Sequence, residues 1–192
     1  MPKPLAVVAL LALAACLGPR SDPSAFFLLS SPPADAAGAP VPVRVGVGPV
    51  TLPSYLDRPQ IVTRISDDEI ALSEADRWAE PLADNLVRTL EENLAGLLPG
   101  SSYVGYPWYA AGAPDYAVAL DVRRFEADAS GVVVLDATWR LSRDDAQVDG
   151  GATRIEEQAA GSDRAAAVAA HSRALAELSR EIAAAVRRAV GP

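Results

Sequence analysis

The stretch YAVALDV at residues 116–122 decides the fold, because large apolar side chains alternate along it with small or polar ones. The stretch VVLDATWRL at residues 133–141 alternates in the same way. A period of two predicts strands with one buried and one exposed face. The segment Asp128-Ala129-Ser130-Gly131 between them is typical of a hairpin turn. We therefore expect the two strands to pair antiparallel in one sheet.

Two amphipathic helices are predicted, at about residues 81–98 and 163–190. In the first helix Pro81 suits the first turn, Pro99-Gly100 ends the helix, and leucines recur every three or four residues. These leucines are Leu82, Leu86, Leu90, Leu94 and Leu97. The apolar stripe of the second helix consists of Val168, Leu175, Leu178, Ile182 and Val186. Each helix is expected to bury its stripe against the sheet.

Shorter apolar segments predict further strands at about residues 26–29, 41–47, 55–65, 70–72 and 153–161. Strands grouped around two amphipathic helices favour the α+β class. The expected architecture is a mainly antiparallel sheet with two helices packed on one face. We see no internal repeat, and residues 26–192 are expected to form a single α+β domain.

The N-terminus has the features of a lipoprotein signal that ends at Cys16, the single cysteine of the chain. Lys3 precedes an uncharged apolar run, and small residues stand directly before the cysteine. The run is shorter than the roughly 20 residues that a transmembrane helix needs. We expect residues 1–15 to be a signal peptide, Cys16 to carry covalent lipid, and residues 16–25 to form a lipidated tether. An ordinary secretory signal whose cleavage site contains a cysteine is the alternative interpretation.

The chain is acidic, with 17 Lys and Arg residues against 25 Asp and Glu residues and a formal net charge of −8. Lys3, its only lysine, lies in the predicted signal peptide. Such a chain repels nucleic-acid phosphates and anionic headgroups, so a nucleic-acid partner is excluded and membrane attachment is expected through the lipid on Cys16. No thiol then remains for a disulfide or a metal, and no cofactor besides the covalent lipid is expected.

Candidate catalytic residues are sparse. His171, the single histidine, lies between Val168 and Leu175 on the apolar stripe of the last helix, so a core or interface position is predicted. Without a second histidine or a free cysteine, the chain has too few residues for a zinc site or a nucleophile–histidine pair. The common hydrolase and nucleotide-binding motifs are absent. The acidic clusters Asp67-Asp68-Glu69 and Asp144-Asp145 are typical of solvated turns and lack calcium-loop spacing. The sequence therefore predicts no enzyme activity.

Residues that suit a protein interface gather in the segment YLDRPQIV at residues 55–62 and just before the first helix. Aromatic and arginine side chains are the types that anchor interfaces. We expect partner-binding roles for Tyr55, Arg58, Gln60 and Trp78. A short loop also holds Tyr103, Tyr106, Trp108 and Tyr109. The alternative role of these rings is to fill gaps in the core at the ends of the sheet.

Four segments together resemble the PqiC family, also called the ABC-type transport auxiliary lipoproteins. They are the signal that ends at Cys16, FFLL at residues 26–29, YLDRPQIV at residues 55–62 and WAEPL at residues 78–82. The resemblance runs from the signal to the last helix and is most specific in the middle of the chain. It implies a periplasm-facing lipoprotein of Gram-negative bacteria that works beside proteins with MCE (mammalian cell entry) domains. In some systems an ABC permease and ATPase take part, and the family carries no catalytic residues.

The function that the resemblance implies is that of a non-enzymatic lipoprotein subunit of an MCE-type lipid transport system. The protein would lie on the periplasmic face of the outer membrane, dock the periplasmic MCE-domain protein, form a homo-oligomer and support envelope integrity. Leu17 follows Cys16 where an Asp would indicate retention at the inner membrane. Two alternatives are a general outer-membrane assembly lipoprotein without a transport partner and an envelope hydrolase. The missing nucleophile–base set disfavours the hydrolase.

The lipid anchor leads to the first prediction. The variant Cys16→Ala lacks the acceptor thiol, so it should stay uncut or become soluble and should no longer incorporate labelled fatty acid. Undiminished labelling and membrane association in this variant would contradict the lipoprotein assignment. Radiolabelling of whole cells followed by membrane fractionation measures both properties.

Overall fold

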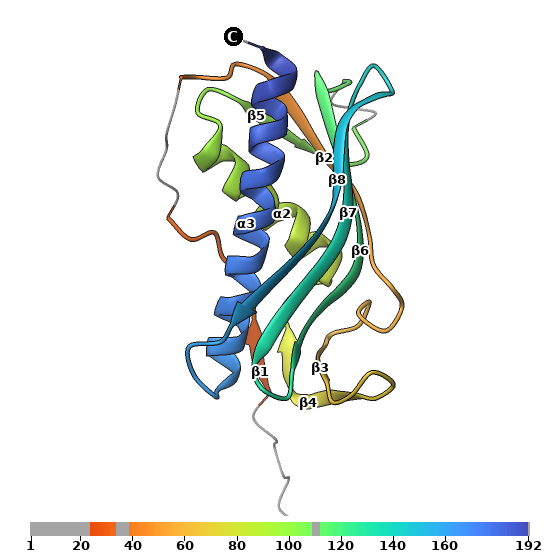
Figure 1. Cartoon of the computed structure of the whole chain (residues 1–192), viewed down its shortest axis with the longest axis vertical. Helices are drawn as coiled ribbons and strands as arrows, with labels where there is room; N and C mark the ends of the chain where they lie inside the picture. The colour runs from red at the N-terminus through yellow and green to blue at the C-terminus, as the bar shows by residue number, and fades with distance from the viewer. Residues whose placement is uncertain (1–23, 34–38, 109–111, 192) are drawn as a thin grey trace, which may run out of the picture.

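The β6 strand (Tyr116–Asp128) is the centre of a twisted mixed sheet (Figure 1). The computed structural model describes residues 24–33, 39–108 and 112–191. The other elements are β1 (Ala25–Phe27), β2 (Arg44–Thr51), β3 (Gln60–Arg64), β4 (Ile70–Trp78), α2 (Leu82–Leu97), β5 (Ser102–Gly105), β7 (Val132–Arg143), β8 (Ala146–Gln158) and α3 (Arg164–Val190). In the part of the chain described, the strand order is β1-β4-β3-β6-β2-β5, with β7 on the other edge of β6 and β8 beside β7.

One edge of β6 is shared by two strands in succession. The β2 strand pairs with the first half of β6 as far as Asp121, and β3 pairs with its last two residues, Ala127 and Asp128. The opposite edge of β6 pairs antiparallel with β7 along nearly its whole length. The predicted hairpin is therefore confirmed. The Asp128 carboxylate stabilises its turn by accepting hydrogen bonds of 2.8 and 3.0 Å from the backbone N–H groups of Ser130 and Val132.

The predicted α+β class with both helices on one face is confirmed, but the sheet is mixed. Three pairings are antiparallel (β3–β4, β6–β7 and β7–β8), and four are parallel (β1–β4, β2–β5, β2–β6 and β3–β6). Each antiparallel pair is joined by a short turn, whereas each parallel pair is separated by a long connection. Parallel strands require such crossovers, and these leave no local signal in the sequence.

Element boundaries differ from the expectation in several places. The strand expected at residues 55–65 begins only at Gln60, because residues 55–59 form a loop, and the strand expected at residues 41–47 spans residues 44–51. The aromatic segment around Tyr103, expected as a loop, contains the edge strand β5. The β4 strand continues to Trp78, far beyond the predicted end at Leu72. The β8 strand begins at Ala146, so that only two residues separate it from β7. Asp144 and Asp145 in that turn have positive φ angles of 49° and 62°, which acidic residues tolerate better than β-branched ones.

A bulge in β6 changes which residues face the core. Up to Val122 the even-numbered residues are buried, as the alternation predicts. The register shifts between Val122 and Arg124, and after it the odd-numbered Phe125 and Ala127 belong to the core. Glu126 consequently lies on the outer face of the sheet, away from the helices.

Helices α2 and α3 cover one face of the sheet and contact each other (Figure 1). Both predicted stripes are confirmed, since four leucines of α2 and the five stripe residues of α3 are buried. The contact between the helices also contains polar groups, because Asn93 Nδ2 donates a hydrogen bond of 3.0 Å to Ser179 Oγ. Over the described residues, neither helix combines the length and the apolar character that crossing a membrane requires.

The segment that follows β1 is fixed by side chains of both helices. Leu29 is 2 % exposed, its N–H donates to Asn85 Oδ1 at 3.1 Å, and its carbonyl accepts from Arg88 Nη2 at 3.2 Å. The N–H of Ser30 donates to Ser172 Oγ at 3.1 Å. These bonds hold the N-terminal strand against the domain before the chain turns away.

His171 lies in the core, as predicted. Its ring packs edge-on against Trp78 and Phe125, with centroid distances of 5.7 and 4.8 Å, and Nδ1 lies 2.8 Å from the carbonyl oxygen of Ala167. Burial lowers the pKa of His171 to about 4. The neutral ring is therefore a packing element of the folded protein at neutral pH.

The lowered pKa of His171 predicts a pH-dependent loss of stability. The unfolded chain takes up the proton near pH 6.5 and the folded chain only near pH 4. The stabilisation is therefore fully present above pH 6.5 and is lost as the pH falls through this window, by about 3 kcal/mol in the free energy of unfolding. The variant His171→Leu keeps an apolar side chain at this position and should fold without this part of the dependence.

Urea unfolding of both proteins from pH 7.5 to pH 4 measures the effect. Carboxylates titrate in both proteins, so the difference between the two curves isolates His171. Parallel curves for the two proteins would show that the ring is not buried in its neutral form.

Candidate functional site

Glu126 is a carboxylate buried on the outer face of the sheet, where β3 begins to pair with β6. It is 1 % exposed, yet it is fully surrounded by donors. Arg64 Nε and Arg124 Nε lie 2.7 and 3.0 Å from Oε1, while Tyr55 O–H donates to Oε2 at 2.9 Å. The backbone N–H of Phe125 donates to Oε2 at 3.0 Å. Tyr55, Arg64, Arg124 and Glu126 are called the Glu126 cluster below.

The charges of the Glu126 cluster oppose the effect of burial on the carboxylate. Burial alone raises the pKa of Glu126, but the hydrogen bonds from Arg64, Tyr55 and Arg124 outweigh it, so its pKa is below the ordinary value. Burial and the negative charge of Glu126 raise the pKa of Tyr55 to about 12. The cluster therefore holds an ionised carboxylate and a neutral phenol at neutral pH, and neither group is available as an acid or base.

The loop between β2 and β3 brings Tyr55 to this position. The loop fills the gap between the end of the β2 pairing at Asp121 and the start of the β3 pairing at Ala127. Leu56 fills its inner side and is 2 % exposed. The Tyr55 hydroxyl also lies 3.1 Å from the carbonyl oxygen of Arg123, inside the gap, so it can donate its proton to that oxygen or to Glu126.

Three of the four predicted partner-binding residues lie on or beside this outer face. Tyr55 is half-buried in the Glu126 cluster. Gln60 is half-buried on β3 and pairs in register with Arg77 of β4. Arg58 is half-buried in the loop; its Nη2 reaches the carbonyl oxygen of Ser54 only at 3.5 Å, and its buried Nε has no partner among the described residues.

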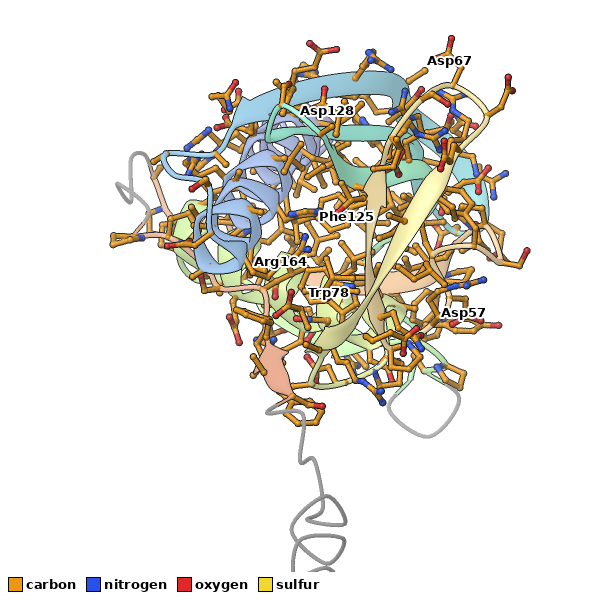
Figure 2. All side chains as sticks on the ribbon, turned by 90° about the horizontal axis from the view of Figure 1, so that it is seen from below. Asp57, Asp67, Trp78, Phe125, Asp128 and Arg164 are labelled. Carbon is orange, nitrogen blue, oxygen red and sulfur yellow. The ribbon has the colours of Figure 1, made fainter. Side chains whose placement is uncertain are left out.

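Trp78, the fourth predicted residue, lies in the core. Its side chain is 5 % exposed and packs against His171, and its backbone N–H donates to the carbonyl oxygen of Pro59 at 2.7 Å. Figure 2 shows Trp78 and Phe125 in the interior, with Asp57 and Asp67 at the rim. We therefore correct the expected contact of the Trp78 ring with a partner, because in this fold the ring holds β4 against α3.

The remaining predicted features lie elsewhere. Cys16 and Tyr109 are outside the described residues. Tyr106, which is 49 % exposed, packs edge-on against Trp108 with a centroid distance of 5.1 Å. The acidic turn Asp67-Asp68-Glu69 is exposed, as predicted. Within residues 24–33, 39–108 and 112–191, no group of three or more His, Cys, Asp or Glu side chains is arranged to hold a metal ion.

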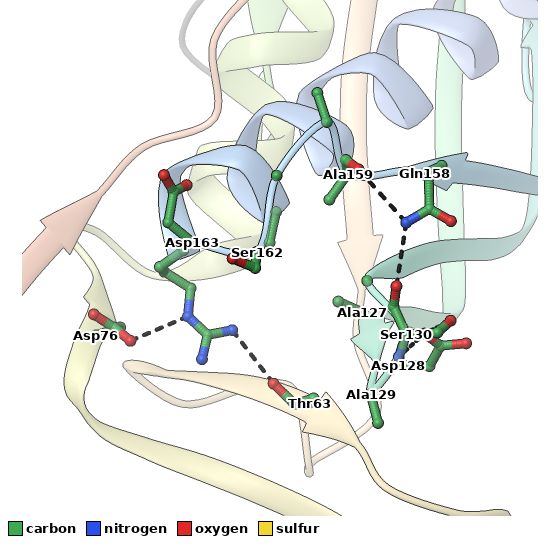
Figure 3. Close-up of a pocket in the computed structure, with 15 residues that line it drawn as sticks. Thr63, Asp76, Ala127, Asp128, Ala129, Ser130, Gln158, Ala159, Ser162 and Asp163 are labelled. Carbon is green, nitrogen blue, oxygen red and sulfur yellow. Dashed lines mark hydrogen bonds and ion pairs between the residues drawn. The ribbon is translucent and has the colours of Figure 1, made fainter.

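A pocket of about 630 Å³ opens between the start of α3 and the β6–β7 turn (Figure 3). Arg164 lines it, with Nε 3.1 Å from Asp76 Oδ2 and Nη1 3.3 Å from Thr63 Oγ1 (Figure 3). Gln158 Nε2 donates to the carbonyl oxygen of Ser130 at 3.2 Å. These contacts join β3, β4, α3 and the turn, so the polar side chains of this pocket already serve to hold the elements together.

A family model described as "ABC-type transport auxiliary lipoprotein component" matches residues 27–183. The chain belongs to this family. The match includes all of α2, most of α3 and every described strand, apart from the first residues of β1. The suspected family assignment is thereby confirmed.

Two curated relatives and two solved structures resemble this auxiliary lipoprotein. "Intermembrane transport lipoprotein PqiC" of Escherichia coli K12 and its Shigella flexneri counterpart are each 30 % identical over 93 residues. The chain thus spans about half the length of these relatives, since 48 % of each sequence is covered. A crystal structure of an uncharacterized protein has a TM-score of 0.72 at 22 % identity, with 85 % of this chain and 99 % of that one covered. A Xanthomonas campestris protein has a TM-score of 0.67 at 21 % identity, with 83 % and 92 % covered, and both show the fold alone.

The sequence analysis of this auxiliary lipoprotein missed Glu126, Arg64 and Arg124. Glu126 is even-numbered, so an unbroken alternation would turn it toward the core, and only the bulge moves it to the outer face. Arg64 is 62 positions from Glu126 along the chain, and nothing local indicates that they meet. A glutamate between the apolar residues Phe125 and Ala127 was the one available signal.

The Glu126 cluster predicts a large stability effect for a small change. The variant Glu126→Gln removes the charge that compensates Arg64 and Arg124 and should lower the free energy of unfolding by about 3 kcal/mol. The variant Tyr55→Phe keeps the ring and removes one donor, so it should cost about 1 kcal/mol. Urea unfolding at pH 7 measures both. Glu69→Gln, the same change at an exposed glutamate of the acidic turn, is the control, and a loss for it equal to that of Glu126→Gln would contradict the role of the cluster.

Proposed function

We propose that this chain is a non-enzymatic lipoprotein subunit of an MCE-type lipid transport system. In this proposal Cys16 carries the lipid that anchors the protein to the periplasmic face of the outer membrane. This chain forms a homo-oligomer and binds a periplasmic MCE-domain protein through the outer face of its sheet around Tyr55, Arg58 and Gln60. In this way it supports envelope integrity. An ABC permease and ATPase act only through that partner.

Arg58 is the observation that carries the docking surface. A guanidinium donor that is buried without an acceptor is costly, and most such groups in native proteins find a partner. Only one bond from Arg58 is formed within the described chain, at the long distance of 3.5 Å. A carboxylate or carbonyl of a docked protein would reach the terminal Nη1 and Nη2 groups of Arg58, which unlike Nε are not buried, and Gln60 offers further donors and acceptors nearby.

The state of the single histidine supports a role in docking rather than in chemistry. His171 is surrounded by Trp78, Phe125 and α3 and has a pKa of about 4, so it neither reaches a substrate nor exchanges a proton near neutral pH. The Glu126 carboxylate is fully occupied by donors. The family description as a transport auxiliary component agrees with this interpretation.

The docking surface is tested by the double variant Arg58→Ala with Gln60→Ala. Loss of an interface anchor should weaken binding to a purified MCE-domain partner by about 2 kcal/mol, which is about 30-fold in Kd. Because both side chains are partly exposed and make few contacts, the melting temperature should change little. Calorimetric titration and thermal unfolding of the same samples measure the two effects.

Arg180→Ala is the matched control, since Arg180 is an exposed arginine on α3, which covers the opposite face of the sheet (Figure 1). It should leave Kd unchanged. Binding of the double variant with wild-type affinity would remove this surface from the proposal. Equal weakening by Arg180→Ala would show that overall charge, not this surface, determines binding.

A further inference from the structure

The first strand of the described fold and the residue directly after it carry two exposed apolar side chains. Phe26 is 65 % exposed and Leu28 is 49 % exposed, whereas the alternate residues Phe27 and Leu29 pack against the core. The backbone of Leu29 is bonded to Asn85 and Arg88, so β1 cannot turn over to bury the outer pair without exposing the inner pair. The exposure of Phe26 and Leu28 is therefore a fixed property of this fold.

The neighbours of these side chains make a surface of mixed character. Arg77 is the pairing partner of Phe26 on β4 and projects from the same face of the sheet, because residues in register share a face. The β1 strand also ends the strand path and pairs with β4 alone among the described strands. An apolar ring beside an arginine at an open edge is a surface that suits the boundary between lipid headgroups and acyl chains.

The position of this edge along the chain brings it near a membrane. Phe26 follows Cys16 by ten residues, and a fully extended chain advances at most 3.6 Å per residue, so the two Cα atoms lie within about 36 Å of each other. Figure 1 shows β1 at the end of the molecule opposite the C-terminal end of α3. Because every other described strand follows β1 along the chain, β1 has the shortest linkage to a lipid on Cys16.

We infer that Phe26 and Leu28, with Arg77 beside them, contact the surface of the membrane in which the lipid on Cys16 is embedded. This inference rests on the lipidation in the proposed function. The net charge of −8 opposes attraction to anionic headgroups, so burial of the two apolar side chains is what holds this edge at the surface. The contact orients the domain with β1 toward the lipid. Because Arg77 also pairs in register with Gln60, the membrane contact borders the proposed docking surface.

The full-length lipidated chain tests the inference in vesicles of phosphatidylethanolamine and phosphatidylglycerol. Because Cys16 is the only cysteine and is blocked by its lipid, Ala25→Cys and Val148→Cys each provide one thiol for an environment-sensitive fluorophore. Both sites are exposed, and Val148 lies on β8. With a spin-labelled quencher in the acyl chains, the label at position 25 should lose most of its emission and shift to shorter wavelength. The label at position 148 should do neither.

The double change Phe26→Ser with Leu28→Ser in the Ala25→Cys background separates the contact from the anchor. It should abolish the quenching and the shift while the chain still floats with the vesicles and keeps its melting temperature. Quenching that survives the double change would mean that the anchor alone brings position 25 to the lipid, and would overturn the inference. A shift without quenching that grows with protein concentration would assign this edge to a second copy instead. A wild-type chain that does not float with the vesicles would overturn the lipidation and this inference together.

Discussion

One edge of β6 pairs with two strands from different parts of the chain, and the arrangement of the domain depends on this shared edge. The β2 strand leaves this edge at Asp121 and the β3 strand takes it up at Ala127. Backbone groups between them would lack partners without another donor, and the Tyr55 hydroxyl reaches the Arg123 carbonyl at this point. The bulge in β6 places Glu126 at the same level, where it fixes the hydroxyl and two arginines. The segment YLDRPQIV, which comprises the end of the β2–β3 loop and the start of β3, is therefore part of the framework as well as a surface.

Local patterns were sufficient for the elements and insufficient for their arrangement. The strands of the β6–β7 hairpin and both helical stripes follow from spacing alone, because burial of one face imposes a period of two or of 3.6 residues. The parallel pairings arise from crossovers, and the strand β5 is short and half-exposed, so neither has a comparable signal. Trp78 shows how far residue type alone can predict a role. Tryptophan is common at interfaces, but the position of Trp78 at the end of β4 makes it part of the core.

The candidate site was predictable only in part. Arg58 and Gln60 lie on an accessible surface, as residues of that type near turns commonly do. The Glu126 cluster combines residues from the β2–β3 loop, β3 and β6, and contacts between segments this distant depend on the tertiary fold. His171 was assigned correctly because its neighbours at helical spacing are apolar, and apolar spacing predicts burial for whatever residue shares the stripe.

The way the first strand is attached has a mechanical consequence. The β1 strand runs parallel to β4, and directly after it Leu29 and Ser30 are bonded to Asn85, Arg88 and Ser172. A pull on the N-terminal end acts along β1, so its ladder to β4 is loaded in shear and its bonds share the force instead of opening one after another. The hydrogen bonds of Leu29 and Ser30 follow that ladder along the chain and resist the same displacement of β1. A domain tethered at this end can therefore bear tension from its tether without first losing the strand that connects it.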